Sequence, residues 1–332
     1  MVTGFVLLSA GALSGCSDRP AKPRATPVAV AAPATDTPLT PASALKAFNL
    51  WANNDDVARA TADERLGLTW ADDGQVAVTA SEFRKAARTG IPPMRFSYGE
   101  PTLWVPRLGG YPQWFVANVT RNGTPSLLAL IKKSPGQRFR LSIAVTPVKG
   151  AKLPQIATDA DGYATAMATR DESLLVGPSL VASLQAAVAE DGSKSFSAPS
   201  LQSGPFTTGL ATQSAKEDKA AGKKDLIYGS AYTAPQLPVF PLRTKDGGCM
   251  VLYPLAHDVA LTRRTDVGPL EAPADAGHLL PTPAVGMQMR ISANLQYAAV
   301  VPPKPVKKVK NPARIAIVAA GGGPVRVQVK TA

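Results

Sequence analysis

The sequence predicts an α+β protein with two tandem domains, each formed by helices that pack on a curved antiparallel sheet. Twice along the chain, segments with a helical spacing of apolar residues are followed by segments in which apolar and polar residues alternate. Such alternation indicates one packed and one solvated face, which is typical of antiparallel sheets. The expected domains are residues 42–152 and 160–332.

The chain opens with a short apolar run from Val2 to Leu13. About a dozen residues suit the apolar region of a signal peptide, whereas a spanning helix needs roughly twenty. The run closes with Leu13, Ser14, Gly15 and Cys16. A leucine, two small residues and a cysteine in this order resemble a bacterial lipobox. The resemblance implies that residues 1–16 are a lipoprotein signal peptide and that Cys16 carries diacylglycerol.

This lipid anchor predicts that the protein is held at the outer, extracytoplasmic face of the cell membrane. The first four residues include no Lys or Arg, although a signal peptide usually opens with basic residues. We therefore expect the translation start to lie upstream. The alternative is an apolar N-terminal element in which Cys16 is coincidental.

Residues 17–41 are mostly Ala, Pro and Thr with a few charges. This composition cannot bury enough apolar surface to offset the entropy lost on ordering the chain. We expect a semi-extended tether that holds the folded body off the bilayer. A tether directly after a lipidated cysteine supports the anchor.

Each expected domain begins with helical patterns. In the first, Leu45, Phe48 and Ala52 share one face of a helix. Asp55 and Asp56 are placed to cap a second helix, and Thr79–Glu82 matches a capping box for a third. In the second, a helix begins at Pro178-Ser179 and ends near Asp191-Gly192, with an apolar stripe of Leu180, Val181, Leu184, Ala187 and Val188.

The strands follow the helices. Alternation predicts strands over 138–145, 287–297 and 325–330, and Gly321–Gly323 reads as a turn between two short strands. Asn122-Gly123 and Asp246-Gly247 predict tight hairpin turns, because both central residues of a type I′ turn need positive φ. These two turns are 124 residues apart, the difference between positions 122 and 246, and we interpret this offset as a domain duplication.

Helices followed by a long curved antiparallel sheet resemble the NTF2-like cone, or its simpler cystatin-like relative. The whole chain, with its lipobox, Ala/Pro-rich tether and duplicated body, is similar to uncharacterised lipoproteins of actinobacteria. This resemblance implies no active-site residue.

Composition narrows the possible functions. Apolar content of 45% describes a globular body, and if Cys16 carries lipid, Cys249 has no disulfide partner. Cys249 starts an apolar strand, so we expect a buried structural thiol.

The net charge is +12, and one basic cluster lies among prolines: Lys304, Lys307, Lys308 and Lys310. No aromatic pattern for base stacking accompanies it, so we expect no nucleic-acid partner. The cluster is a solvated loop, or a surface contact to anionic lipid or wall polymer.

Motifs for catalysis are weak. Ser43 with Lys46, and Ser292 with Asn294, match fragments of a penicillin-binding enzyme but stand in different domains, and the Lys-Thr-Gly motif is missing. His257 and His278 lack neighbouring ligands, so we expect no metal. Phosphate-binding glycine loops are also absent, so we expect no cofactor.

Acid–base catalysis in a cone pocket would use an Asp and a Tyr, but the sequence has too many candidates to single out one pair: Tyr98, Tyr111, Tyr163, Tyr253, Asp171 and Asp258. Trp104 and Trp114 fit core packing better than a pocket mouth.

The sequence therefore predicts a lipid-anchored protein without a catalytic residue, acting as a binding or interaction module of the cell envelope. The expected partner is an envelope protein, a wall polymer or a small apolar ligand. The alternative is a pocket enzyme of isomerase or hydrolase type on an NTF2-like cone. In the favoured hypothesis the domains are filled or shallow, and substitution of either histidine affects stability at most.

Overall fold

The computed structural model describes residues 38–280, 284–307 and 310–330, and residues 37–332 form one compact unit. The lipobox Leu13, Ser14, Gly15 and Cys16 lies outside the described residues, as do Lys308 and the tether up to residue 37. No helix in the described part of the chain is long and apolar enough to cross a membrane. The anchor therefore stays a prediction from the sequence.

The first helix, α1 (Pro41–Thr61), begins with a reciprocal cap in which Thr40 and Ser43 bond each other's backbone N–H. We expected Asp55 and Asp56 to cap a second helix, and this is wrong because α1 continues through them. Asp55 instead accepts a hydrogen bond from Arg59 one turn later, at 2.8 Å, and both side chains are buried. An ion pair at this spacing supports the helix rather than ending it.

Two further helices follow, α2 (Glu64–Thr69) and α3 (Asp73–Thr89). The expected capping box at 79–82 lies inside α3, which begins earlier because the Asp72 carboxylate caps the N–H of Asp73 at 2.8 Å. Ser81 serves tertiary contacts instead and donates to the carbonyl oxygen of Pro324 at 2.8 Å.

The first four strands form an antiparallel meander: β1 (Thr102–Trp104), β2 (Gln113–Arg121), β3 (Thr124–Lys132) and β4 (Arg140–Pro147). The predicted turn joins β2 to β3, with φ of 50° at Asn122 and 76° at Gly123. One face packs on α1 around Phe48, Trp51 and Phe115. The other face is buried as well, and for this reason β2 and β3 lack a clear alternation.

The second half begins with α4 (Val181–Asp191) and α5 (Thr208–Gly222). A short 3-10 turn over Pro178–Leu180 leads into α4, and Gly192 follows its end, as predicted. The predicted apolar stripe is partly wrong: Leu180 is 52% exposed, whereas Gln185 is fully buried. Gln185 occupies the core because it bonds the hydroxyl of Tyr253 at 2.7 Å.

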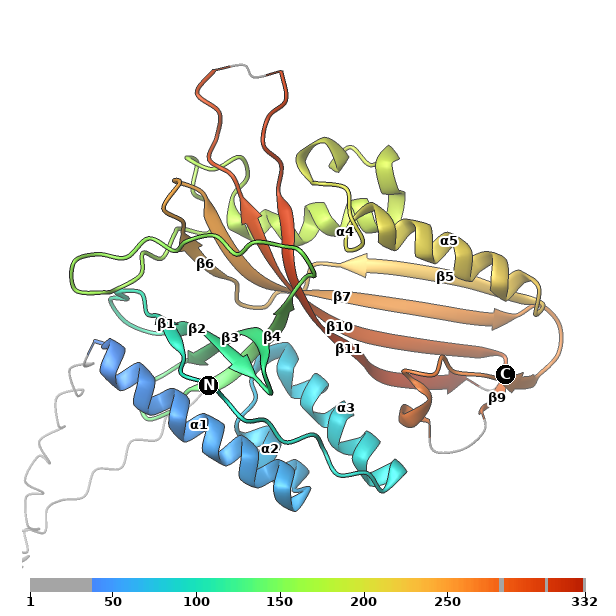
Figure 1. The fold of residues 1–332 in the computed structure, drawn as a ribbon. Coiled ribbons are helices and arrows are strands. Elements are labelled where there is room, and N and C mark those ends of the chain that lie inside the picture. The colour runs from blue at the N-terminus through green and yellow to red at the C-terminus, as the bar shows by residue number, and fades with distance from the viewer. Residues whose placement is uncertain (1–37, 281–283, 308–309, 331–332) are drawn as a thin grey trace, which may run out of the picture. The chain divides into compact units, whose positions relative to one another are not determined.

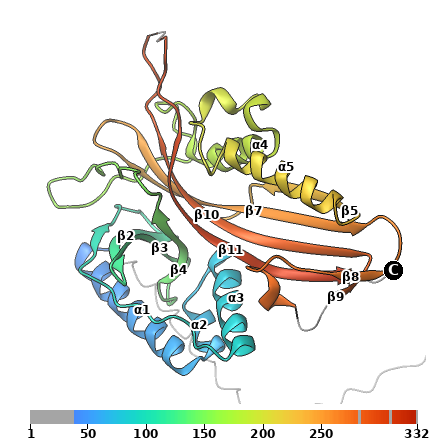
Figure 2. The ribbon, with the colours of Figure 1, turned by 45° about the vertical axis from the view of Figure 1, so that its right-hand side comes forward.

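The second set of strands is longer. It comprises β5 (Leu226–Thr233), β6 (Phe240–Arg243), β7 (Cys249–Arg263), β10 (Gln288–Val301) and β11 (Ala316–Lys330), with a small hairpin of β8 (Gly268–Leu270) and β9 (Ala284–Gly286). β5 and β6 lie end to end along the same edge of β7, whose other edge pairs with β10. Figures 1 and 2 show α4 and α5 on the β5 side of this sheet.

A single sheet links the two halves in the order β1-β2-β3-β4-β11-β10-β7-β5, because Thr146 and Pro147 of β4 pair with Ala320 and Ala319 of β11. Residues 42–152 and 160–332 therefore share one sheet within the compact unit, where we expected two separate bodies. The mixed α+β class with a large antiparallel sheet is confirmed.

The 124-residue offset between the two hairpin turns stays a prediction of a duplication. The turn at Asn122-Gly123 joins β2 to β3, and the turn at Asp246-Gly247 joins β6 to β7; β1 precedes the first pair in the chain, and β5 precedes the second. The type I′ turn predicted at Asp246-Gly247 is wrong, because Gly247 has φ of 83° whereas Asp246 does not have a positive φ. Each half has helices followed by an antiparallel meander.

The expected turn at Gly321–Gly323 is also wrong, since β11 runs straight through these residues. Gly322 has φ of 80°, and a Cβ there would stand 2.0 Å from the Asn294 carbonyl oxygen of β10. At Gly321 a Cβ would stand 2.3 Å from the Ala144 carbonyl oxygen of β4. The glycines therefore allow three strands to come close together, and the register shifts between β10 and β11 lie on either side of them, at Val318 and Val325.

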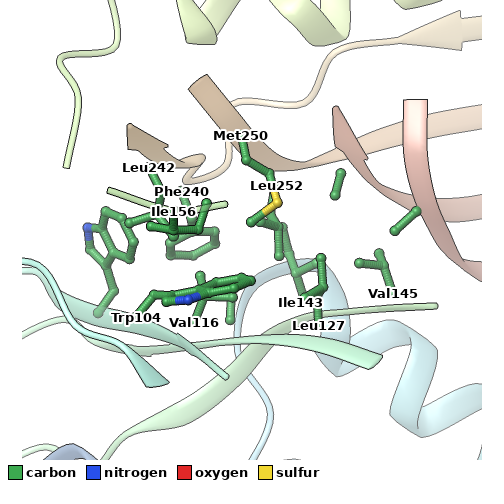
Figure 3. Close-up of a cluster of buried hydrophobic side chains, with 14 of the residues drawn as sticks. Trp104, Val116, Leu127, Ile143, Val145, Ile156, Phe240, Leu242, Met250 and Leu252 are labelled. Atoms are coloured by element: carbon green, nitrogen blue, oxygen red, sulfur yellow. The ribbon is translucent and has the colours of Figure 1, made fainter. Parts of the chain in front are cut away.

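A shared apolar core lies between the two halves (Figure 3). Trp104, Val116 and Ile143 come from the first meander, and Phe240 and Leu252 from the second. The ring of Trp114 meets that of Phe240 edge to face, with centroids 5.4 Å apart. The two halves are thus joined by buried side chains as well as by strand pairing.

Candidate ligand-binding pocket

A pocket of about 750 Å³ opens between α5, the strands β5, β7 and β10, and the segment that carries β8. Its walls are mostly apolar side chains, among them Leu226, Val259, Leu261, Ile291 and Leu295. This volume lies within the range of roughly 300–1,000 Å³ typical of small-molecule sites. Of the expectation that the domains are filled or shallow, the first alternative is therefore wrong for the second half.

Strand register explains why these residues share one face. His257 and Val259 of β7 lie directly opposite Ala293 and Ile291 of β10. On the same face, one end of the sheet is filled by the core under α4, around Tyr253 and Tyr297, and the other by a cluster around Leu270 and Met289. The pocket is the space between these two clusters.

Helix α5 leaves this space open because its side chains there are small or polar. Leu210, Ser214, Glu217 and Ala221 follow the i, i+4, i+7, i+11 spacing of one helix face, and only Ala221 is buried. A helix packed on a sheet usually presents bulky apolar residues along such a face. Small and polar residues at these positions are the kind of local inconsistency that marks functional sites.

Three polar residues line one corner of the pocket, Glu217, Tyr228 and His257, and further polar groups contact them from behind. The Ser230 hydroxyl lies 2.9 Å from Nε2 of His257 and 3.4 Å from the hydroxyl of Ser214. The Tyr228 hydroxyl donates to Oε2 of Glu217 at 2.8 Å. The ring of Tyr232 stacks on His257 with centroids 4.0 Å apart. Tyr228, Ser230 and Tyr232 alternate along β5, so all three face α5 and His257.

The corner is uncharged at His257 and Tyr228 in neutral solution. Burial lowers the pKa of His257 below its usual value, and the carboxylates of Glu217 and Asp258 only partly oppose this effect. Burial, helped by the hydrogen bond to Glu217, raises the pKa of Tyr228 to about 12. The imidazole and the phenol therefore offer neutral hydrogen-bonding groups to a ligand.

His257 also makes the stability of the protein depend on pH. Because its folded pKa lies below the unfolded value of roughly 6.5, the unfolded chain binds more protons in that window. We expect the contribution of His257 to the free energy of unfolding to be fully present above about pH 6.5. This contribution is lost as the pH falls below that value. Urea unfolding at several pH values measures this slope, which His257→Gln should reduce.

The matched variant for this measurement is His278→Gln, since burial also lowers the pKa of His278. Each single substitution should remove part of the slope, and the double variant most of it. A slope unchanged in all three variants would contradict the assignment of neutral histidines.

Ser230 and His257 suggest a nucleophile and base, but the orienting third group is missing. Among the described residues no carboxylate accepts a hydrogen bond from Nδ1 of His257: Glu217 binds Tyr228, and Asp258 accepts from Ser292 at 2.5 Å. Asp258 is adjacent to His257 on the strand and so belongs to the opposite face of the sheet. The described residues also contain no group of three His, Cys, Asp or Glu able to hold a metal ion.

Apart from His257, the residues singled out from the sequence and placed below do not line this pocket. Trp104 and Trp114 are core residues, and Cys249 is buried, which raises the pKa of its thiol to about 12; all three were expected to be buried. Tyr98 lies beside α1, and Tyr253 is fully buried under α4. His278 contacts the Ser81 hydroxyl of α3 at 3.0 Å. Lys304, Lys307 and Lys310 are exposed on the connection between β10 and β11.

Sequence reasoning missed the polar corner, although one signal was present. Alternate positions Tyr228, Ser230 and Tyr232 mark one strand face. The pairing that brings this face to His257, 27 residues away, is visible only in the fold.

Comparison with known proteins places the chain among proteins without an assigned activity. Residues 36–322 match the family model described as a domain of unknown function, DUF8094, and the chain belongs to this family. An uncharacterised lipoprotein of Streptomyces coelicolor is 26% identical over 264 residues, which is 74% of this chain and 73% of that protein. A second uncharacterised lipoprotein of the same organism is 26% identical over 155 residues, 46% of each chain.

These relatives confirm the expected similarity to actinobacterial lipoproteins and imply membrane anchoring through a lipid. No solved structure matches the chain. The likeness to an NTF2-like or cystatin-like cone accordingly stays a prediction.

Proposed function

We propose that this protein is a lipid-anchored module at the outer face of the cell membrane that binds a small amphipathic ligand without transforming it. The observation that carries the proposal is the apolar pocket that Tyr228 and His257 line at one corner, with the Ser230 hydroxyl 2.9 Å from Nε2 of His257. Its walls suit an apolar body, and its corner suits a single uncharged hydroxyl, carbonyl or amide. The two halves, in this proposal, are NTF2-like or cystatin-like relatives derived from one ancestral domain.

Two features favour a ligand over a core that is merely loosely packed. Protein interiors are close-packed and contain few voids larger than a water molecule. Val259, Leu261 and Leu295 nonetheless remain only half-buried, although they lie between two filled clusters. The polar corner is also ordered by the protein itself, because the hydroxyls of Tyr228 and Ser230 each have a protein partner. Preorganised groups reduce the entropy cost of binding.

The proposal is tested with N-phenylnaphthylamine, a neutral apolar dye that carries one N–H group. We expect saturable binding with an increase in dye fluorescence, weakened about tenfold or more by Ala293→Phe, because the added ring occupies the pocket wall. Fluorescence titration of the purified protein measures this change.

Ala260→Phe is the matched control. Ala260 lies on β7 next to the pocket but does not line it, since it is opposite Arg290 and on the other face of the sheet. Equal affinities of the two variants, or no saturable binding at all, would contradict a ligand site here.

The contact of 2.9 Å between Ser230 and His257 is the one observation that favours the alternative, a pocket hydrolase. The two functions differ in what Ser230→Ala does. An enzyme would hydrolyse p-nitrophenyl esters and lose this turnover completely, since the nucleophile is removed. A binding module shows no Ser230-dependent turnover and keeps most of its affinity for the dye.

A further inference from the structure

The connection between β10 and β11 carries a run of basic side chains on a long projecting loop (Figures 1 and 2). β10 ends at Val301 and β11 begins at Ala316. Between these residues the sequence has four lysines and one arginine and no Asp or Glu. Such a run produces a local positive field unless carboxylates from elsewhere neutralise it.

No such neutralisation is present in the part of the loop that the structure describes. Lys304, Lys307, Lys310 and Arg314 are all exposed, and none of these four forms an ion pair. Arginines elsewhere do find partners: Arg95 pairs with Asp56 at 2.7 Å. The loop cations are therefore free to contact an external anionic surface.

The loop also exposes an apolar side chain among its cations. Val306 is 98% exposed, while most large apolar residues of the described chain are buried or half-buried. Prolines at 302, 303 and 305 fix φ and remove backbone donors, and strand pairing in this part of the loop is limited to one isolated bridge between Pro303 and Leu174. An apolar side chain flanked by lysines is the pattern of segments that lie at a bilayer interface.

The base of the loop is held by backbone hydrogen bonds on both sides. The backbone N–H of Lys304 donates to the carbonyl oxygen of Ser173 at 2.8 Å, and that of Leu175 donates to Pro302 at 3.0 Å. On the other side, the N–H of Ile315 donates to the carbonyl oxygen of Ser200 at 2.9 Å. Both ends are thus fixed to the segments that flank α4.

We propose that this loop docks on the anionic head groups of the bilayer to which the chain is anchored, with Val306 entering the interface. The inference is independent of the pocket and needs only the lipid anchor at Cys16. Charge complementarity selects an anionic surface, and the exposed valine selects a bilayer over a soluble polyanion. Basic residues near such a surface each strengthen association roughly fivefold.

The test uses the full lipidated chain with Val306→Cys, labelled with an environment-sensitive nitrobenzoxadiazole dye. Cys249 is buried, so the dye reacts at position 306. The labelled protein is reconstituted in vesicles of phosphatidylcholine alone, or of equal parts of phosphatidylcholine and phosphatidylglycerol. We expect a blue-shifted, brighter emission only with phosphatidylglycerol, and its loss at high salt.

Charge reversal at Lys304, Lys307 and Lys310, each to Glu, should lower the ratio of docked to undocked loop by about a hundredfold or more. The control is the same change at Lys216, Lys219 and Lys223, which are exposed on and just after α5, and it should leave the emission unaltered. Equal emission in both lipid mixtures would overturn the proposal. So would a response to soluble poly(glycerol phosphate) without a response to phosphatidylglycerol, which would assign the loop to a wall polymer.

Discussion

Replacing Cys16 by alanine is expected to leave the protein without its lipid, either released from membranes or retained as unprocessed precursor. The sulfur of Cys16 is the predicted attachment point for diacylglycerol, and the apolar run before it is too short to span a bilayer. None of the helices in the described residues is long and apolar enough to cross a membrane. Cell fractionation with metabolic labelling by a radioactive fatty acid measures the effect.

Cys249→Ala provides the control for this experiment, because it removes the other cysteine of the chain and leaves the lipobox intact. That variant should keep both the label and the membrane fraction. Mature-sized Cys16→Ala protein that still partitions with membranes would contradict the anchor and return the N-terminal segment to an ordinary apolar element.

Replacing Phe240 by alanine is expected to destabilise both halves of the described unit together, by about 3–5 kcal/mol. Phe240 is fully buried in the core that the two halves share, against the ring of Trp114. During urea unfolding the two halves can be followed by separate probes. Tryptophan emission reports on the first half, because all four tryptophans lie at or before position 114. Thiol labelling in a Cys16→Ser background reports on the second half, because its only thiol is then Cys249. Tryptophan emission and thiol labelling should shift to the same lower urea concentration.

Leu201→Ala separates cooperative unfolding from a local effect at the shared core. Leu201 is buried in the cluster under α4 and belongs to the second half alone. If residues 37–332 unfold as one unit, this variant also moves both probes equally. A shift in Cys249 labelling without a shift in tryptophan emission would restore the two independent domains that the sequence suggested.

The pocket and the basic loop give the second half two roles that do not compete for residues. The pocket lies toward the far ends of β7 and β10, with His257 and Ile291, whereas the loop leaves the sheet at Val301. Loss of dye binding in Ala293→Phe and loss of docking in the lysine variants should therefore be separable. A protein held at the bilayer by a lipid and a basic loop would present its pocket near molecules that partition into membranes.

Features that depend on a few neighbouring residues could be read from the sequence alone. The start and end of α4 are one example, because Pro178 and Gly192 act on the local backbone. Turn chemistry at Asn122-Gly123 is equally local. The strand patterns also gave the α+β class, and with it the apolar start of β7 that buries Cys249.

Tertiary structure alone decided which of these elements meet. Alternation along a strand says which residues share a face but not which strand lies beside it, so the pairing of β4 with β11 and the shared core behind it could not be predicted. The same limit hid the pocket. His257 looked isolated because Ser230 and Glu217 reach it from β5 and α5, and the space between them exists only because α5 places small and polar side chains over the sheet. Sequence spacing fixes local conformation, whereas pockets and shared cores depend on long-range packing that no short segment encodes.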